Sequence, residues 1–163
     1  MFYIGVDPGL DGAVAILNAT GSLCVIRDTP TLTIGGPRGK RREYNLRLMS
    51  TLFPPAEECV VFIERVHSMP GQGVRSMWTM GFGSGAWLGI LSALGIKYEL
   101  VTPQRWQKVM LDGQGKGKDA TRGQAMALFP SVAGQLNRKK DHGRADALLI
   151  AEYGLRSRCV ILG

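Results

Sequence analysis

Two acidic residues directly follow apolar runs that read as buried strands. Asp7 ends the run at residues 2–6 and precedes a Pro-Gly turn, and Glu64 follows the run at residues 60–63. Because an ionised carboxylate is costly to desolvate, one at a buried strand end usually lies near a cation, a metal ion or a substrate. Two simpler interpretations remain open. Asp7 could form an Asx-turn with the residues after it, and Glu64 could pair with Arg65.

A third source of acidic groups lies in a predicted helix at about residues 142–153. His142 and Asp146 are four residues apart and therefore share one face of that helix. Asp141 more naturally caps the helix, and a lone histidine such as His142 is more typical of a surface. Acidic groups gathered from separate elements fit Mg²⁺, which binds through a few carboxylates and keeps water and phosphate ligands. Two such ions can hydrolyse a phosphodiester by activating water and neutralising the leaving oxygen.

The order of predicted elements indicates an α/β domain that spans residues 1–163. Short β-rich runs separated by turn residues predict an antiparallel meander of three strands, at 2–6, 13–17 and 23–27. The Pro-rich, Gly-rich and basic residues 30–42 predict a loop. Two more strands are expected at 60–64 and 98–101, and helices at 43–53, 74–94, 103–110 (capped by Thr102) and 119–129 (capped by Asp119). This order predicts a five-stranded mixed sheet flanked by helices.

Composition favours a polyanionic partner, because the chain of 163 residues carries a formal charge of +7. Its three cysteines, Cys24, Cys59 and Cys159, are scattered and predict neither a disulfide framework nor a zinc site. The longest apolar stretch, at about 86–94, is too short to span a membrane, and no signal sequence is recognisable. We therefore expect an intracellular, soluble protein of the cytoplasm or nucleoid, with no membrane partner.

Four short motifs occur in the order and approximate spacing of the RuvC-type Holliday junction resolvases. They are Ile4-Gly-Val-Asp-Pro-Gly9, Phe62-Ile-Glu64, Val101-Thr-Pro103 and Ala145-Asp-Ala-Leu148. The chain therefore resembles that family over nearly its whole length, which implies the RNase H-like fold. The resemblance also implies a homodimer that binds four-way DNA junctions and makes paired, symmetric nicks with two Mg²⁺ or Mn²⁺ ions, leaving 5′-phosphate and 3′-hydroxyl ends. By the same resemblance Asp7, Glu64 and Asp146 are catalytic metal ligands.

The fourth ligand is less well defined by the resemblance. The family has an acid, or in some members a histidine, about one turn before the last aspartate, and here Asp141 and His142 both lie near that position. We predict His142 as a catalytic residue and metal ligand, and keep Asp141 as the alternative. An imidazole there could ligate a metal or carry a proton, and would shift preference toward Mn²⁺. The run at residues 139–146 is similar to virus-encoded and organellar branches of the family.

Basic residues form three clusters that could position DNA through its phosphates. We predict DNA contacts at Arg41 and Arg42 (with Arg38 and Lys40), at Lys116, Lys118 and Arg122, and at Lys139, Lys140 and Arg144 (with Arg138), together with Arg75. A solvated charged rim is the simpler interpretation of any single one. Lys116 and Lys118 match a basic segment that contacts DNA in the family.

Two features of the helix at 74–94 have alternative interpretations. Trp78 lies where relatives place a side chain near the junction crossover and could stack on exposed bases, but we favour a core position. Gly81, Gly85 and Gly89 recur every four residues along one face. They predict a contact across a dimer, and close packing on the chain's own sheet is the competing interpretation.

Other functions fit the sequence less well. The first motif also resembles the phosphate motif of actin-like ATPases and sugar kinases, but those proteins need two lobes. Residues 113–118 lack the Walker A pattern, so we expect no nucleotide cofactor. Another RNase H-like nuclease, acting on branched DNA or RNA–DNA hybrids, and a non-catalytic junction-binding protein remain as alternatives. The last of these would not require Glu64 and Asp146.

Overall fold

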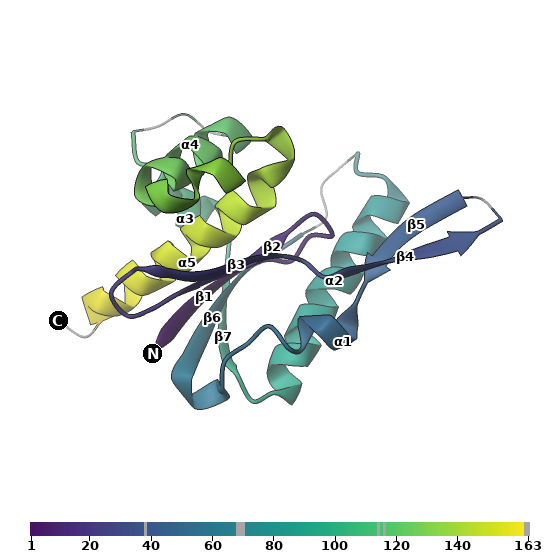
Figure 1. Cartoon of the computed structure of the whole chain (residues 1–163), viewed down its shortest axis with the longest axis horizontal. Helices are drawn as coiled ribbons and strands as arrows, with labels where there is room; N and C mark the ends of the chain where they lie inside the picture. The colour runs from purple at the N-terminus through teal and green to yellow at the C-terminus, as the bar shows by residue number, and fades with distance from the viewer. Residues whose placement is uncertain (38, 68–70, 114, 116, 162–163) are drawn as a thin grey trace.

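A five-stranded mixed sheet lies at the centre of the computed structural model (Figure 1), in the order β3-β2-β1-β6-β7. The structure describes residues 1–37, 39–67, 71–113, 115 and 117–161, and only the backbone of 158–161. The strands are β1 (Phe2–Asp7), β2 (Ala13–Leu17), β3 (Leu23–Asp28), β6 (Cys59–Glu64) and β7 (Lys97–Val101). β1, β2 and β3 pair antiparallel, and β6 and β7 run parallel to β1. The predicted meander and mixed sheet are confirmed.

Helices cover both faces of this sheet (Figure 1). On one face lie α3 (Pro103–Met110), α4 (Lys118–Leu128) and α5 (His142–Ile161), and on the other lie α1 (Leu46–Met49) and α2 (Val74–Ala93). Short 3-10 turns occur at Ala56–Glu58, Pro130–Gln135 and Lys139–Asp141. Alternation along β1 divides the core, since Tyr3 packs on the α5 face while Ile4 and Val6 pack on the α2 face. Side chains on the α5 face of β1 therefore point toward α5.

Glycine lets α5 pack directly against β1. A Cβ atom at Gly5 would overlap the carbonyl oxygen of Ala147 and the nitrogen of Ala151. One turn further along α5, a Cβ atom at Gly154 would overlap the ring of Phe62. This close approach fixes α5 against the middle of the sheet. It also determines where the first turn of α5 lies relative to the end of β1.

Residues 30–42 form most of a β-hairpin, so the predicted loop is wrong. β4 (Thr31–Gly36) pairs antiparallel with β5 (Gly39–Tyr44) as a separate two-stranded sheet that extends away from the main sheet beyond α2 (Figure 1). A lone hairpin is marginal in water, and this one is held at its base. The Tyr44 hydroxyl donates to the carbonyl oxygen of Pro8, and Arg42 Nη2 donates to the carbonyl oxygen of Leu10. Because most hairpin side chains are exposed, no apolar alternation marked the strands.

Four further element boundaries differ from prediction. The helix predicted at 43–53 is only α1, because Tyr44 belongs to β5 and Asn45 caps the helix by accepting from the Leu48 N–H. α2 ends at Ala93 instead of residue 94. α4 is capped by Gly117, whereas Asp119 lies in its first turn. α5 continues to Ile161 instead of ending near residue 153. The predicted cap of α3 is confirmed, since Thr102 accepts from the Arg105 N–H.

No helix among the described residues is both long and apolar enough to cross a membrane. Cys24 is exposed, Cys59 is buried, and both are free thiols. The side chain of Cys159 lies outside the described part of the chain.

Candidate active site

Asp7 and Glu64 lie side by side at the carboxyl ends of two neighbouring parallel strands. Val6 of β1 is in register with Ile63 of β6, so the two acids come next in register, and paired strands are about 4.7–4.9 Å apart. Asp7 lies two residues after Gly5, and Glu64 lies two residues after Phe62. Both Gly5 and Phe62 pack on α5. Alternation along the strands therefore points both carboxylates toward the α5 face.

Gly143 brings the first turn of α5 against the Asp7 carboxylate. A Cβ atom at Gly143 would lie 3.1 Å from Asp7 Oδ2 and 2.8 Å from the Cα atom of Gly12. The predicted Asx-turn is also present, because Asp7 Oδ1 accepts from the Gly9 N–H at 3.1 Å. The two interpretations of Asp7 are therefore compatible. The turn orients one carboxylate oxygen while the other faces the start of α5.

Three half-buried carboxylates are electrostatically linked at this sheet edge, because the charge of Asp7 acts on both Glu64 and Asp146. Burial, with the charges of Asp7 and Asp146, raises the pKa of Glu64 to about 8. Burial, followed by the charge of Asp7, raises the pKa of Asp146 to about 7. Burial also raises the pKa of Asp7, although the Gly9 N–H and the charges of His142 and Lys118 oppose that shift. Acids from β1, β6 and α5, predicted separately, are thus brought within electrostatic reach of one another.

Asp146 is incompletely satisfied by protein groups. Its Oδ1 atom is buried and has no hydrogen-bond partner among the described residues. A hydrogen bond from Thr121 and the charge of Lys118 lower its pKa, but burial outweighs both. A buried carboxylate oxygen without a donor is expensive in free energy. This oxygen is therefore suited to receive a cation.

His142 is oriented by its own backbone neighbourhood. Its Nδ1 atom lies 3.2 Å from the carbonyl oxygen of Lys139, and its Nε2 atom lies 3.3 Å from Lys118 Nζ. Since a carbonyl can only accept, Nδ1 donates to it, and in the neutral form of the ring the lone pair of Nε2 accepts from the Lys118 ammonium. A histidine held in this way by a carbonyl presents its other nitrogen as a ligand. The arrangement fits the predicted role of His142.

Asp141 is fully engaged elsewhere. Its side chain is 3% exposed and makes an ion pair of 2.8 Å with Arg138 Nη2. It also accepts from the Arg138 backbone N–H at 3.0 Å, so it closes a capping box on the 3-10 turn before α5. These bonds from Arg138 lower the pKa of Asp141. Asp141 is therefore a capping residue here, and we do not carry it forward as a ligand.

The predicted DNA-binding residues differ in exposure and in pairing. Arg122 and Arg144 are largely covered, and the others that the structure describes are exposed. Arg122 is only 12% exposed and donates to Asp119 and to the carbonyl oxygen of Asn137. Arg144 pairs through two nitrogens with Asp28, and Arg42 pairs with Asp11 at 2.6 Å. Arg41, although paired with Glu43, is exposed, as are Arg75, Lys118, Lys139 and Lys140. Arg38 and Lys116 lie outside the described residues.

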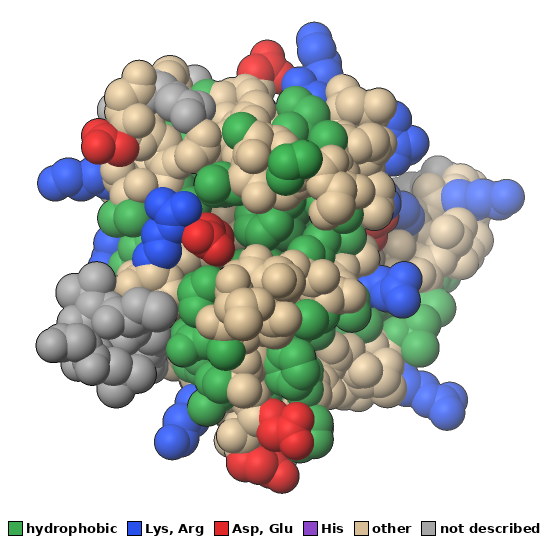
Figure 2. Space-filling view, turned by 60° about the vertical axis from the view of Figure 1, so that its left-hand side comes forward, with side chains coloured by type: hydrophobic (Ala, Val, Ile, Leu, Met, Phe, Trp, Pro, Cys, Tyr) green, Lys and Arg blue, Asp and Glu red, His purple; other side chains and the backbone are tan. Residues whose placement is uncertain are grey.

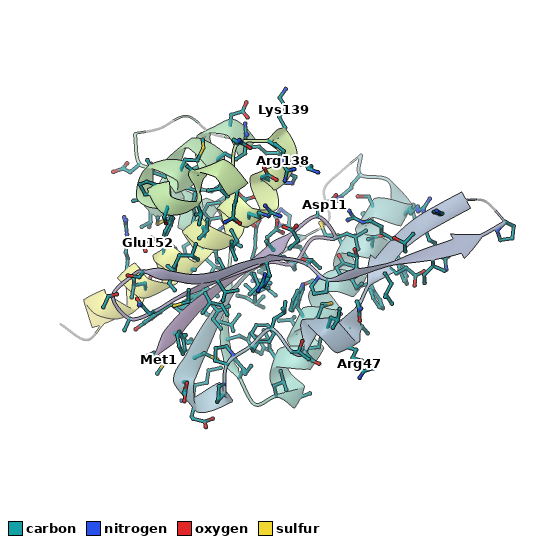
Figure 3. All side chains as sticks on the ribbon, in the orientation of Figure 1. Met1, Asp11, Arg47, Arg138, Lys139 and Glu152 are labelled. Carbon is teal, nitrogen blue, oxygen red and sulfur yellow. The ribbon has the colours of Figure 1, made fainter. Side chains whose placement is uncertain are left out.

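Basic side chains are not gathered in one patch on the side of the molecule shown in Figure 2. In this view, turned so that the left-hand side of Figure 1 comes forward, Lys and Arg side chains are spread around the edge and hydrophobic side chains lie toward the centre. Lys139 projects outward near the start of α5 (Figure 3). Exposed basic residues also occur on the hairpin and at the start of α2, on the opposite face of the sheet from α5.

The predicted core position of Trp78 is wrong. Its side chain is 68% exposed and stacks on Phe82, with ring centroids 5.2 Å apart and an interplanar angle of 11°. A cleft of about 550 Å³ lies between this pair and the hairpin, and Arg41, Tyr44 and Arg75 line it. No amphipathic signal marked Trp78 as exposed, because apolar residues occur all around α2.

Gly81, Gly85 and Gly89 do not pack on the chain's own sheet. A Cβ atom at any of the three would meet nothing within 4 Å. The glycine of α2 that does pack closely is Gly83, where a Cβ atom would overlap the Tyr44 ring. The competing interpretation of the stripe is therefore wrong, and the stripe faces outward.

Two residues beside the acids were not predicted. Thr121 of α4 acts on Asp146 and donates to the carbonyl oxygen of Lys118. The indole nitrogen of Trp106, buried and without a hydrogen-bond partner among the described residues, lies close enough to Glu64 to lower its pKa. The sequence offers one signal for Thr121, which is its position three residues after Lys118 in the same helix.

The donor set fits a hard divalent cation. Three electrostatically linked carboxylates, one of them with an unsatisfied oxygen, together with an oriented imidazole, make up a donor set of the kind that Mg²⁺ and Mn²⁺ take. In the described part of the chain, however, no three acidic, histidine or cysteine side chains already stand in a metal-binding arrangement.

Known structures share this fold. RuvC of Thermus thermophilus in complex with a Holliday junction substrate matches 98% of this chain and 96% of its own, with a TM-score of 0.58 and 14% identity. Another Thermus thermophilus RuvC structure matches 98% of this chain with a TM-score of 0.55 and 17% identity. The fold is therefore that of RuvC, as predicted.

Sequence comparison finds a curated relative. The chloroplastic Holliday junction resolvase MOC1 of Chlamydomonas reinhardtii is 37% identical over 121 residues, which are 72% of this chain and 14% of that protein. The match confirms the predicted resemblance to RuvC-type resolvases, although the chain spans only a small part of this relative. No family model matches the chain.

Proposed function

We propose that this chain is a metal-dependent endonuclease that resolves four-way DNA junctions by paired, symmetric nicks. The observation that carries the proposal is the group of three half-buried, electrostatically linked carboxylates, Asp7, Glu64 and Asp146, at one edge of a RuvC-type sheet. The sequence relative is a Holliday junction resolvase and the RuvC structure holds a Holliday junction substrate, which supports a junction as the substrate of this chain.

The acids and His142 would hold the cations. Asp7, Glu64 and Asp146 would hold the ions through carboxylate oxygens, and His142 Nε2 would add a nitrogen ligand. Two ions, Mg²⁺ or Mn²⁺, would when bound supply an activated water and neutralise the leaving oxygen. Hydrolysis in this way leaves a 5′-phosphate and a 3′-hydroxyl.

Lys118 supplies a positive charge beside the three acids. Its ammonium group lies 3.3 Å from His142 Nε2, and its charge also lowers the pKa of Asp7 and Asp146. If His142 Nε2 held a metal ion, it would give up the hydrogen bond to Lys118, because both would use the same lone pair. The Lys118 ammonium would then be available to a non-bridging oxygen of the scissile phosphate.

Exposed side chains on both faces of the sheet would hold the branched substrate. Lys139 and Lys140 lie beside the start of α5, and Arg41 and Arg75 line the cleft that contains Trp78 and Phe82. An exposed aromatic stack flanked by arginines suits base faces that have no stacking neighbour, where stacking contributes about 1–3 kcal/mol for each base. Such faces can open where four duplex arms cross, and a continuous duplex does not offer them.

A homodimer would give the paired nicks. Gly81, Gly85 and Gly89 present an open, side-chain-free stripe on the outer face of α2, which lets another helix approach closely. We assign this stripe to the contact between two copies of the chain. In that arrangement each copy supplies one acid site for one of two symmetric cuts.

The test uses four synthetic substrates of the same sequence: a four-way DNA junction, a DNA replication fork, a linear DNA duplex and an RNA–DNA hybrid. Each is incubated with the purified protein in Mg²⁺, in Mn²⁺ or in chelator, and the cut positions are mapped. Symmetric nicks confined to the junction and dependent on the metal support the proposal. Cleavage of RNA–DNA hybrid or random duplex identifies a different RNase H-like nuclease instead.

Binding without cleavage would identify an architectural protein. To separate cleavage by this chain from cleavage by a contaminating nuclease, the same assay includes Glu64→Gln. If junction cleavage persists unchanged in this variant, the activity comes from a contaminating nuclease and the proposal fails.

A further inference from the structure

A polar cavity of about 220 Å³ lies on the other side of the β1–β2 turn from the three acids. The turn separates the two sites, because the Gly12 backbone and the Asp11 carbonyl contact Gly143 beside Asp7. Figure 3 shows Asp11 and Arg138 near the same end of α5. The cavity is larger than the roughly 30 Å³ that one water occupies in the liquid, so it has room for a tetrahedral anion.

The cavity wall is rich in positioned cations. Arg42, Arg138, Lys140 and Arg144 line it, against Asp11, Asp28 and Asp141, which leaves one net positive charge. Each arginine is held by one carboxylate: Arg42 by Asp11 at 2.6 Å, Arg138 by Asp141 at 2.8 Å and Arg144 by Asp28 at 2.6 Å. An arginine fixed in this way keeps other N–H groups for a second acceptor. Lys140 forms no ion pair with any described residue and contributes a free charge.

A buried hydroxyl in the same wall has no partner. Thr29 is 4% exposed and lines the cavity, and its Oγ1 atom has no hydrogen-bond partner among the described residues. Leaving a buried hydroxyl unpaired costs about 1–3 kcal/mol. An acceptor bound in the cavity and reached by rotation of this side chain would satisfy it. Thr29 and the cations therefore point to an anionic ligand by two independent observations.

We propose that this cavity binds a backbone phosphate of the DNA strand adjacent to the scissile phosphate. The inference rests on the proposed function, because it takes DNA as the ligand. Binding here would set the register of the strand across the β1–β2 turn, so that the neighbouring phosphodiester lies over Asp7. The cavity would thus position the substrate and take no part in bond breaking.

The first test compares two lysines of equal charge. Junction affinity is measured by fluorescence anisotropy in chelator, over a series of salt concentrations, for the wild type, Lys140→Ala and Lys97→Ala. Lys97 is exposed at the start of β7, at the opposite end of the sheet. We expect Lys140→Ala to weaken binding by roughly 3-fold to 10-fold and to reduce the salt slope by about one, as loss of one phosphate contact does. Equal behaviour of the two variants would overturn the proposal.

A second test locates the phosphate. Single phosphates on either side of the cut are replaced by uncharged methylphosphonates, and each substrate is titrated with wild type and Lys140→Ala. At one position, the methylphosphonate should weaken junction binding by the wild type but should weaken binding by Lys140→Ala very little. The two changes then remove the same contact, so their effects do not add. If the two changes weaken binding additively at every position, the cavity binds no phosphate of the DNA and is only a hydrated cluster of ion pairs.

Thr29→Val separates binding from folding. This change replaces an unpartnered hydroxyl by a methyl group of the same shape, so we expect an unchanged or higher melting temperature with a roughly 2-fold to 5-fold loss of junction affinity. Unchanged affinity would count against the site. If instead the wild type fails to bind junctions at all, the proposed function fails before this site is tested.

Discussion

The two faces of the sheet differ in how closely their glycines pack and in where their charged groups lie. On the α5 face, Gly5 and Gly143 let backbone approach backbone, and the three acids are half-buried there. On the α2 face, Gly81 and Gly85 meet only open space, and Trp78 is exposed. The α5 face uses close packing within the chain to hold charged groups in place. The α2 face leaves the side chain of Trp78 and the backbone at the glycines exposed, so these surfaces are available for contact with another molecule.

Amide replacement of the acids should have the largest effect. Glu64→Gln or Asp146→Asn removes a proposed ligand and with it several kcal/mol of transition-state stabilisation. We expect single-turnover cleavage of the junction to fall by roughly 10³-fold while junction affinity stays equal or rises, because a buried negative charge is removed. Glu99→Gln is the control, since Glu99 lies on the neighbouring strand β7 but pairs with Arg105. Similar losses in the control and the site variants would contradict the assignment.

A pair of glycine substitutions tests the contrast in packing. A methyl group at Gly5 would overlap the α5 backbone, so Gly5→Ala should lower the free energy of unfolding by about 3 kcal/mol or more. The same change at Gly85 meets no atom and improves helix propensity by about 1 kcal/mol. Denaturant unfolding measures both. Equal effects of the two substitutions would show that the faces do not differ as described.

The half-buried acids also predict how stability depends on pH. The pKa of Glu64 rises from 4.5 to about 8 on folding, so between these values the folded protein holds a proton that the unfolded chain has lost. Stability in chelator should therefore fall as pH rises from about 5 to 8, by up to roughly 4 kcal/mol from this group. Glu64→Gln should flatten the curve, and a divalent cation should offset the loss at high pH. Parallel melting curves for wild type and variant would contradict the raised pKa.

The smallest of these effects concerns the exposed aromatic pair. Trp78→Ala should weaken junction binding by about 1–3 kcal/mol, the contribution of one stacked base, and leave duplex binding unchanged. Because Trp78 is 68% exposed, the melting temperature should change little. Sedimentation should show the same oligomeric state as the wild type, in contrast to Gly85→Arg, which would block the α2 stripe. Loss of the dimer in Trp78→Ala would reassign Trp78 to the interface.

The same contrast explains what could be predicted from the sequence. On the α5 face, burial imposes regular patterns, and the strand ends at Asp7 and Glu64 and the spacing of His142 and Asp146 were readable. The hairpin at 31–44 and the exposure of Trp78 were missed, because nothing in the chain's own core constrains them. Contacts that depend on tertiary packing, such as that of Thr121 with Asp146 or Arg138 with Asp141, also have no local signature beyond short spacing.

The proposed nuclease activity requires that the three acids form a cation site. Calorimetric titration of Mn²⁺ into the wild type and into Asp146→Asn at pH 7 tests this directly. We predict saturable binding by the wild type with release of protons, because Glu64 and Asp146 are partly protonated at that pH, and binding weaker by at least about 10-fold in the variant. Equal Mn²⁺ affinity in the two proteins, or no saturable binding by the wild type, would contradict it.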